Sequence, residues 1–204
     1  LSEYFETMTE QVFDHQGTLK EYVGDELMAI FGAPLDQADH AQRACAAALA
    51  MRERLQALRQ EWARIGRPPL TARIGINSGP MLVGNIGSRY RFSYGALGDQ
   101  VNLGSRLEGL NKMYSTEILL GENTARFLEG SFLLRELDMV KVVGRKQPLR
   151  IYELVGKPDD SFPEERKLAL GHFAAGLDAY RRQLWQDAIE FFNQSLAVWP
   201  EDGP

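Results

Sequence analysis

Two short segments of the sequence place polar side chains where they could do chemistry. The first, residues 17–34, carries Asp25 directly after Gly24, between two apolar runs. A carboxylate at the tip of a β-hairpin is held rigidly, and its oxygens are hard ligands of the kind that Mg²⁺ and Mn²⁺ prefer. Asp is also a favoured turn residue that needs no metal, so this segment alone favours an ordinary turn.

The second segment, residues 95–112, places Asn102 and Arg106 four positions apart in a predicted helix. Side chains at this spacing lie on the same helix face. An amide beside a guanidinium suits an anionic phosphate or a ribose oxygen, although polar pairs of this kind often form only the solvated side of a helix. Asp99 directly precedes the periodic residues, so we expect it to be the N-cap.

Apolar periodicity and turn residues predict the elements that position these two segments. A GD turn joins two short strands into a hairpin, and a strand at 70–79 is expected to pair with the next one at 80–87. Residues 88–97 form a polar and aromatic stretch. We expect helices at 1–15, 40–65, 100–113 and 122–128, and strands at 18–24, 26–32, 70–79, 80–87, 116–121, 137–143 and 149–155. This order predicts an α+β sandwich with helices packed on a sheet.

The character of the chain changes after residue 156. Residues 157–166 are rich in charge and proline, which predicts a linker, and residues 167–204 fit a helix pair of the tetratricopeptide pattern. A single repeat cannot bury its own apolar face. It must therefore cap the preceding domain, residues 1–156, or continue beyond residue 204.

Composition narrows the class of protein. The 204 residues carry 23 Lys and Arg against 28 Asp and Glu, a formal net charge of −5, which argues against broad binding to nucleic acid. The single cysteine, Cys45, excludes an internal disulfide framework and suits a reducing compartment, so we expect a cytoplasmic location. The apolar stretches are too short to span a membrane, and residues 1–11 do not form a signal peptide.

Four stretches resemble, in order and spacing, the catalytic domain of class III nucleotidyl cyclases, the adenylate and guanylate cyclase family. They are GTLKEYVGDELMAIFGAP, ARIGINSGPMLVGNIGS, GDQVNLGSRLEGLNK and RIYELVG. The resemblance covers about residues 1–156. It implies a ferredoxin-like α+β core that forms a head-to-tail homodimer, with each active site in the dimer cleft and built from both subunits.

The resemblance also implies a mechanism. Two Asp hold two divalent cations, Mg²⁺ or Mn²⁺, which activate the ribose 3′-hydroxyl of GTP or ATP for attack on the α-phosphate, and pyrophosphate leaves. Asp25 matches the second of these Asp residues. Asn102 and Arg106 match the pair that holds the ribose and stabilises the charge that develops on the α-phosphate.

The chain departs from the family pattern at the metal and triphosphate positions. The other metal-binding Asp belongs upstream of the first helix, where this sequence begins, so we expect the missing strand, and any sensor or membrane domain, to precede Leu1. Val143 occupies the position of the usual triphosphate-binding Lys. Lys141, two residues away, and Arg145 are the candidates to replace it, and the alternative is a weakened grip on the triphosphate.

The base-reading positions also depart from the adenylate cyclase pattern, because Glu21 and Gly95 stand where Lys and an Asp or Thr are expected. A carboxylate only accepts hydrogen bonds, which suits the N1–H and 2-amino donors of guanine. Gly95 removes the acceptor that adenine needs and leaves room for O6. Strand alternation is expected to point Lys20 to the other face. The positions therefore favour GTP over ATP.

Three functions compete on this sequence. The favoured one is a purine nucleotidyl cyclase that forms cyclic GMP, with an adenylate cyclase that forms cyclic AMP as the alternative. A second class is a regulatory, weakly catalytic cyclase-like module, suggested by Val143, but Asp25, Asn102 and Arg106 are all present, which argues against such decay. The third, an interaction scaffold built on the helical tail, rests on one short helix pair.

Overall fold

The computed structural model describes residues 1–128, 130–142 and 147–204, which form an α+β fold. The helices are α1 (Ser2–Asp14), α2 (His40–Arg64), α3 (Asp99–Tyr114), α4 (Glu122–Leu128), α5 (Glu164–Arg181) and α6 (Trp185–Val198). The strands are β1 (Thr18–Val23), β2 (Glu26–Ile30), β3 (Ile74–Ile76), β4 (Leu82–Ser88), β5 (Arg91–Leu97), β6 (Ile118–Gly121), β7 (Leu133–Val140) and β8 (Leu149–Gly156). The predicted fold class is confirmed. Within the described ranges, no helix is both long and apolar enough to cross a membrane.

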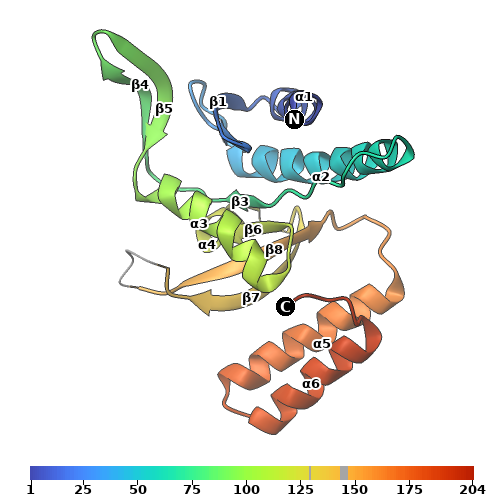
Figure 1. The fold of residues 1–204 in the computed structure, drawn as a ribbon. Helices are drawn as coiled ribbons and strands as arrows, with labels where there is room; N and C mark the ends of the chain where they lie inside the picture. The colour runs from blue at the N-terminus through green and yellow to red at the C-terminus, as the bar shows by residue number, and fades with distance from the viewer. Residues whose placement is uncertain (129, 143–146) are drawn as a thin grey trace.

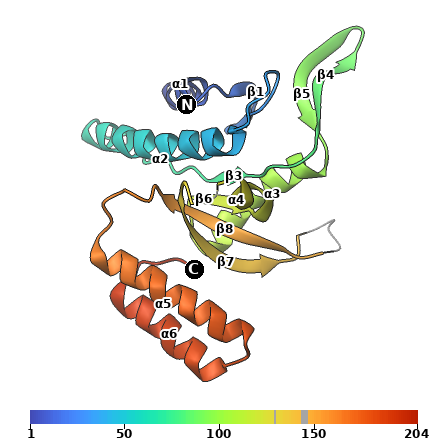
Figure 2. The same ribbon diagram turned by 180° about the vertical axis from the view of Figure 1, so that it is seen from behind.

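A four-stranded sheet in the order β3-β6-β8-β7 forms the centre of the molecule. β3 runs parallel to β6, and the other neighbours are antiparallel. α1 and α2 lie on one side of this sheet and the α5–α6 pair on the other (Figures 1 and 2). The β1–β2 hairpin and the β4–β5 hairpin are separate two-stranded sheets, and the latter projects from the body as a long arm.

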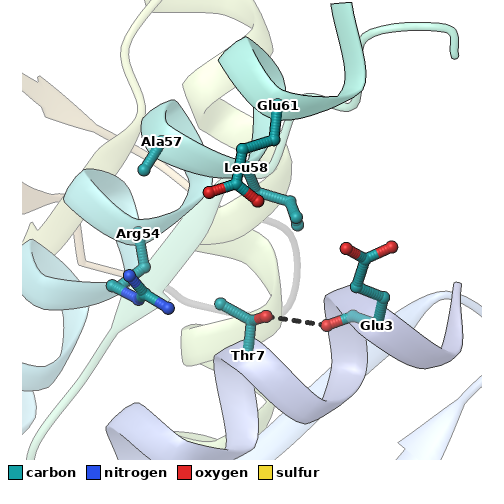
Figure 3. A pocket seen from close by; sticks show the side chains of 6 residues that line it. All are labelled: Glu3, Thr7, Arg54, Ala57, Leu58 and Glu61. Carbon is teal, nitrogen blue, oxygen red and sulfur yellow. Dashed lines mark hydrogen bonds between the residues drawn. The ribbon is translucent and has the colours of Figure 1, made fainter. Parts of the chain in front are cut away.

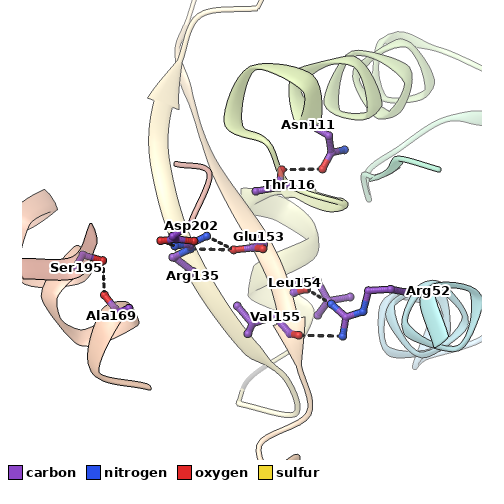
Figure 4. Close-up of polar contacts among 10 residues, drawn as sticks. All are labelled: Arg52, Asn111, Thr116, Arg135, Glu153, Leu154, Val155, Ala169, Ser195 and Asp202. Atoms are coloured by element: carbon purple, nitrogen blue, oxygen red, sulfur yellow. Dashed lines mark hydrogen bonds and ion pairs between the residues drawn. The ribbon is translucent and has the colours of Figure 1, made fainter. Parts of the chain in front are cut away.

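Both faces of the central sheet are buried, which explains the nearly continuous apolar sequence of β6. On one face, Ile118 and Leu120 pack against the alanine-rich side of α2. On the other face, Leu119 packs with Leu103 and Leu107 of α3. The side chain of Arg52 also ties α2 to the sheet, because its guanidinium donates to the backbone carbonyl of Val155 at 3.0 Å (Figure 4).

The predicted pairing of 70–79 with 80–87 is wrong. β3, which is only Ile74–Ile76, pairs with β6, while β4 pairs with β5 along their whole lengths. The polar and aromatic stretch at 88–97 is therefore mostly strand β5. A parallel partner more than 40 residues away leaves no local trace in the sequence, whereas the tight turn at 89–90 sets the β4–β5 register directly.

The C-terminal helix pair caps the sheet. α5 begins at Glu164, inside the segment predicted to be linker, and its buried Phe173 and Leu177 join the same core as α3. Arg135 of β7 is buried and forms ion pairs with Glu153 of β8, at 2.6 Å, and with Asp202 of the C-terminal tail (Figure 4). A cap of this kind is one of the two arrangements that the tetratricopeptide pattern allowed.

The contact between β3 and α3 generates a stability prediction. A β-carbon on Gly75 would overlap the carbonyl oxygen of Gly104 and the amide nitrogen of Glu108, both backbone atoms of α3 that cannot move alone. We expect Gly75→Ala to lower the free energy of unfolding by about 1–3 kcal/mol, measured by urea denaturation.

The control for this substitution is Gly109→Ala, in α3, the helix that a β-carbon on Gly75 would meet. Nothing lies within 4 Å of a β-carbon on Gly109, so the change should raise the stability by up to about 1 kcal/mol. If Gly75→Ala proves as stable as Gly109→Ala, the close approach of α3 to β3 is wrong.

Candidate functional site

Asp25 lies exposed at the tip of the β1–β2 hairpin, as the sequence predicts. Gly24 supplies the turn with a φ of +65°, a left-handed conformation that glycine adopts without strain. α1 packs against the hairpin, because the ring centroid of Tyr22 lies 4.5 Å from that of Phe5 and its hydroxyl is 2.7 Å from that of Thr9. The carboxylate is therefore presented outward on a supported turn.

Asp25 can supply one ligand to a cation, but the described residues around it do not form a complete metal centre. Among the described residues, no three His, Cys, Asp or Glu side chains cluster closely enough to hold a metal. Mg²⁺ commonly uses one or two carboxylates together with water and the phosphates of a substrate, and Asp25 can serve in that way. Its negative charge also reaches the buried Tyr4, whose hydroxyl pKa is raised mainly by burial and further by Asp25.

The expectation that Lys20 and Glu21 point to opposite faces is wrong. The pairing register steps from Leu19 opposite Ala29 to Glu21 opposite Met28, so Lys20 is the extra residue of a β-bulge. A bulge breaks the alternation of side chains along a strand. The Lys20 ammonium forms an ion pair with the Glu21 carboxylate, and its side chain is only 17% exposed, against 42% for Glu21.

Gly95, the second predicted base-reading position, is buried in β5 and faces the side chain of Lys20. A β-carbon built on Gly95 would lie 2.8 Å from Cε and 3.8 Å from Cγ of Lys20. The structure therefore brings Gly95 next to Lys20, which in turn pairs with Glu21, although strand alternation predicted that the lysine points away. The bulge that places it there depends on the pairing of β1 with β2 and leaves no signature in the residue pattern.

α3 positions Asn102 and Arg106. The N-cap of this helix is Gly98 and not Asp99, which is the first helical residue. The Asn77 amide fixes the beginning of the helix by donating to the Gln100 carbonyl at 2.9 Å. Near its end, the fully buried Asn111 donates to the carbonyl of Ile74 at 3.0 Å and accepts from the Thr116 hydroxyl at 2.8 Å (Figure 4).

Asn102 and Arg106 lie on the outer side of this anchored helix. Asn102 is exposed and Arg106 half-buried, and neither side chain makes a hydrogen bond or ion pair with any residue that the structure describes. No polar contact within the described chain joins them to Asp25. Both views place α3 and the tip of the β1–β2 hairpin at different heights in the molecule (Figures 1 and 2). The two motifs are thus presented separately.

The candidate triphosphate residues are only partly defined. Lys141 follows the end of β7 and is exposed. Arg145 and Val143 lie outside the described residues.

Two cavities of the described chain lie away from all these residues. One, of about 140 Å³, lies between α1 and α2 and is lined by Glu3, Thr7, Arg54, Ala57, Leu58 and Glu61 (Figure 3). The other, of about 560 Å³, is an open hollow between the start of α2 and residues 157–159. Neither contains a residue predicted to bind metal, phosphate or base.

Comparison with known proteins identifies the surrounding domain. Residues 1–156 match the model of the adenylate and guanylate cyclase catalytic domain. Adenylate cyclase 1 of Rhizobium meliloti is 40% identical over 156 residues, which are 76% of this chain and 24% of that protein. The terminal-differentiation-specific adenylate cyclase of Dictyostelium discoideum is 31% identical over 208 residues, covering 100% of this chain and 10% of that protein. The chain thus spans a quarter or less of these relatives.

Solved structures of a guanylyl cyclase and of an adenylyl cyclase are both similar to this chain. The guanylyl cyclase Cya2 matches with a TM-score of 0.72 and 35% identity, over 78% of this chain and 80% of that one. The adenylyl cyclase CyaB from P. aeruginosa matches with a TM-score of 0.71 and 32% identity, over 79% and 83%. The likeness therefore fixes the catalytic fold without separating the two substrates.

Proposed function

The chain belongs to the adenylate and guanylate cyclase catalytic domain family, and from this premise we propose that it cyclises GTP, in preference to ATP, to the 3′,5′-cyclic nucleotide and pyrophosphate. The observation that carries the proposal is how α3 presents the side chains of Asn102 and Arg106. An amide and a guanidinium stand side by side on a rigid helix, with no partner among the described residues. Such a pair is suited to a ligand that carries both a ribose and phosphates.

The chemistry proposed for these side chains is electrostatic and positional. Arg106 binds the α-phosphate and stabilises the negative charge that grows there as the 3′-oxygen attacks and pyrophosphate leaves. Because α3 is anchored at both ends, this charge stabilisation needs no rearrangement during the reaction. Asn102 orients the ribose so that its 3′-oxygen faces the phosphorus. Lys141 is proposed to hold the triphosphate.

Asp25 is the proposed ligand of the divalent cations that this family requires. When bound, such cations acidify the ribose hydroxyl and neutralise the triphosphate. The exposed position of Asp25 at a supported turn favours this role. Its separation from α3 indicates that Asp25 of one chain works with Asn102 and Arg106 of another.

The β4–β5 arm supports assembly of two copies. It exposes large apolar side chains on a projecting hairpin, where a monomer would gain nothing from them. These side chains are Leu82, Tyr90, Phe92 and Leu97. We propose that the arm packs against a second copy of this chain and brings the two half-sites together.

The preference for GTP is proposed from the base-reading positions. Glu21 offers acceptor oxygens to the N1–H and 2-amino donors of guanine, whereas adenine would present its unprotonated N1 to the carboxylate. The second candidate substrate is ATP, which is favoured by the similarity to relatives named adenylate cyclases.

A mixing experiment tests the shared site. We expect Asp25→Ala and Arg106→Ala, each made in a protein that also contains the strand expected before Leu1, to remain folded and to be inactive alone. Mixed in equal amounts, they should recover about a quarter of the wild-type activity, because half of the dimers are mixed and each of these has one intact site. Absence of recovery, when labelled subunits are seen to exchange, would refute the two-chain site.

The ratio of kcat/KM for GTP and ATP, measured with Mg²⁺ or Mn²⁺, tests the purine preference. An unpaired contact of adenine N1 with Glu21 costs about 1–3 kcal/mol, so the wild type should prefer GTP by roughly tenfold to hundredfold. Replacing Glu21 with Lys and Gly95 with Asp should move the ratio toward ATP. A wild type that already prefers ATP would contradict the assignment of Glu21.

A further inference from the structure

Lys20 lies against both predicted base-reading residues, Glu21 and Gly95, although the prediction did not include it. The bulge in β1 turns this residue toward Glu21 and Gly95 instead of away from them. The Lys20 side chain is more than four-fifths buried, which is unusual for lysine and indicates that its stem is packed. Its Cε occupies the space that a side chain at position 95 would need.

This space corresponds to a particular group of the proposed substrate. In the proposed reading of the base, position 95 faces the substituent at C6 of the purine, and Glu21 faces N1. The absence of a side chain at Gly95 therefore leaves no acceptor there, and Cε of Lys20, the carbon that carries the ammonium donor, occupies the space instead. Guanine carries the acceptor O6 at C6, whereas adenine carries an amino group.

We propose that Lys20 is a third specificity-determining residue, which donates a hydrogen bond to O6 of guanine while Glu21 accepts from N1–H and the 2-amino group. This inference rests on the proposed function and extends it to a residue outside the expected positions. An ammonium has three donors, so Lys20 can keep its bond to one oxygen of Glu21 and still reach the base. The second oxygen of Glu21 remains available for guanine.

The pair discriminates against adenine at two adjacent atoms. The 6-amino group of adenine would face the ammonium, donor against donor, and its N1 would face the carboxylate, acceptor against acceptor. Each mismatch sets a charged group against an atom that cannot pair with it, which is a larger penalty than the loss of one neutral hydrogen bond. A lysine that serves only to neutralise Glu21 would give no such dependence on the C6 atom.

The test uses Lys20→Met, which keeps the length of the stem and removes the donor, in the full chain. The probes are GTP and 6-thio-GTP, in which sulfur replaces O6 and accepts hydrogen bonds only weakly. We expect the wild type to bind GTP about tenfold more tightly than 6-thio-GTP and Lys20→Met to bind the two about equally. Binding is measured at equilibrium by displacement of a fluorescent guanine nucleotide, and kcat/KM is measured in parallel. Lys112→Met, an exposed lysine near the end of α3, is the matched control and should keep the wild-type ratio.

A second variant separates the role of the ammonium from its effect on folding. Gly95→Ala would press on Cε of Lys20 and displace the ammonium, so it should reduce the preference for GTP over 6-thio-GTP in the wild-type background. In the Lys20→Met background, where no ammonium remains to be displaced, the same change should shift this ratio less than it does in the wild type. Additive effects in the double variant would show that the two residues act independently and would overturn the inference.

The outcomes distinguish this inference from the proposed function. If Lys20→Met keeps the wild-type ratio of GTP to 6-thio-GTP, Lys20 does not contact O6 and the inference is wrong, even when cyclisation of GTP is normal. If the ratio collapses in the binding assay, the inference stands even where neither nucleotide is cyclised, and only the proposed activity fails.

Discussion

The attachment of α3 to the central sheet is the constraint on which the candidate site depends. Leu103 and Leu107 bury one side of the helix in the core, and Gly75 allows the helix backbone to approach β3 more closely than any side chain would permit. The buried amide of Asn111 then ties the end of the helix to the carbonyl of Ile74. Asn102 and Arg106 are fixed in direction because the opposite side of their helix cannot move.

The same architecture underlies the proposal that the site is shared between two chains. The hairpin that carries Asp25 rests on α1, on the far side of α2 from the central sheet, whereas α3 belongs to the sheet itself. The C-terminal pair stiffens the opposite face through Arg135, which links β7, β8 and the tail. The body thus carries the two proposed half-sites at separate places, and the β4–β5 arm exposes the apolar surface that we propose packs against a second copy.

The sequence predicted correctly those features that depend on a few neighbouring residues. The turn at Gly24 and Asp25 and the placement of Asn102 and Arg106 on one helix face are confirmed, because a tight turn and a helical repeat are encoded within a few residues. The roles of these residues in binding stay predictions. The predictions that failed depended on how strands pair. β3 pairs with the distant β6, which leaves β4 free to pair with its neighbour β5, and the bulge at Lys20 arises from the register of β1 against β2.

The central claim is that activity requires two copies of this chain, and specific activity measured against protein concentration tests it most directly. With GTP and Mg²⁺ in excess, activity per mole should fall on dilution, with a midpoint equal to the dimer dissociation constant from sedimentation velocity under the same conditions. Full specific activity at concentrations where sedimentation finds only monomer would contradict the account.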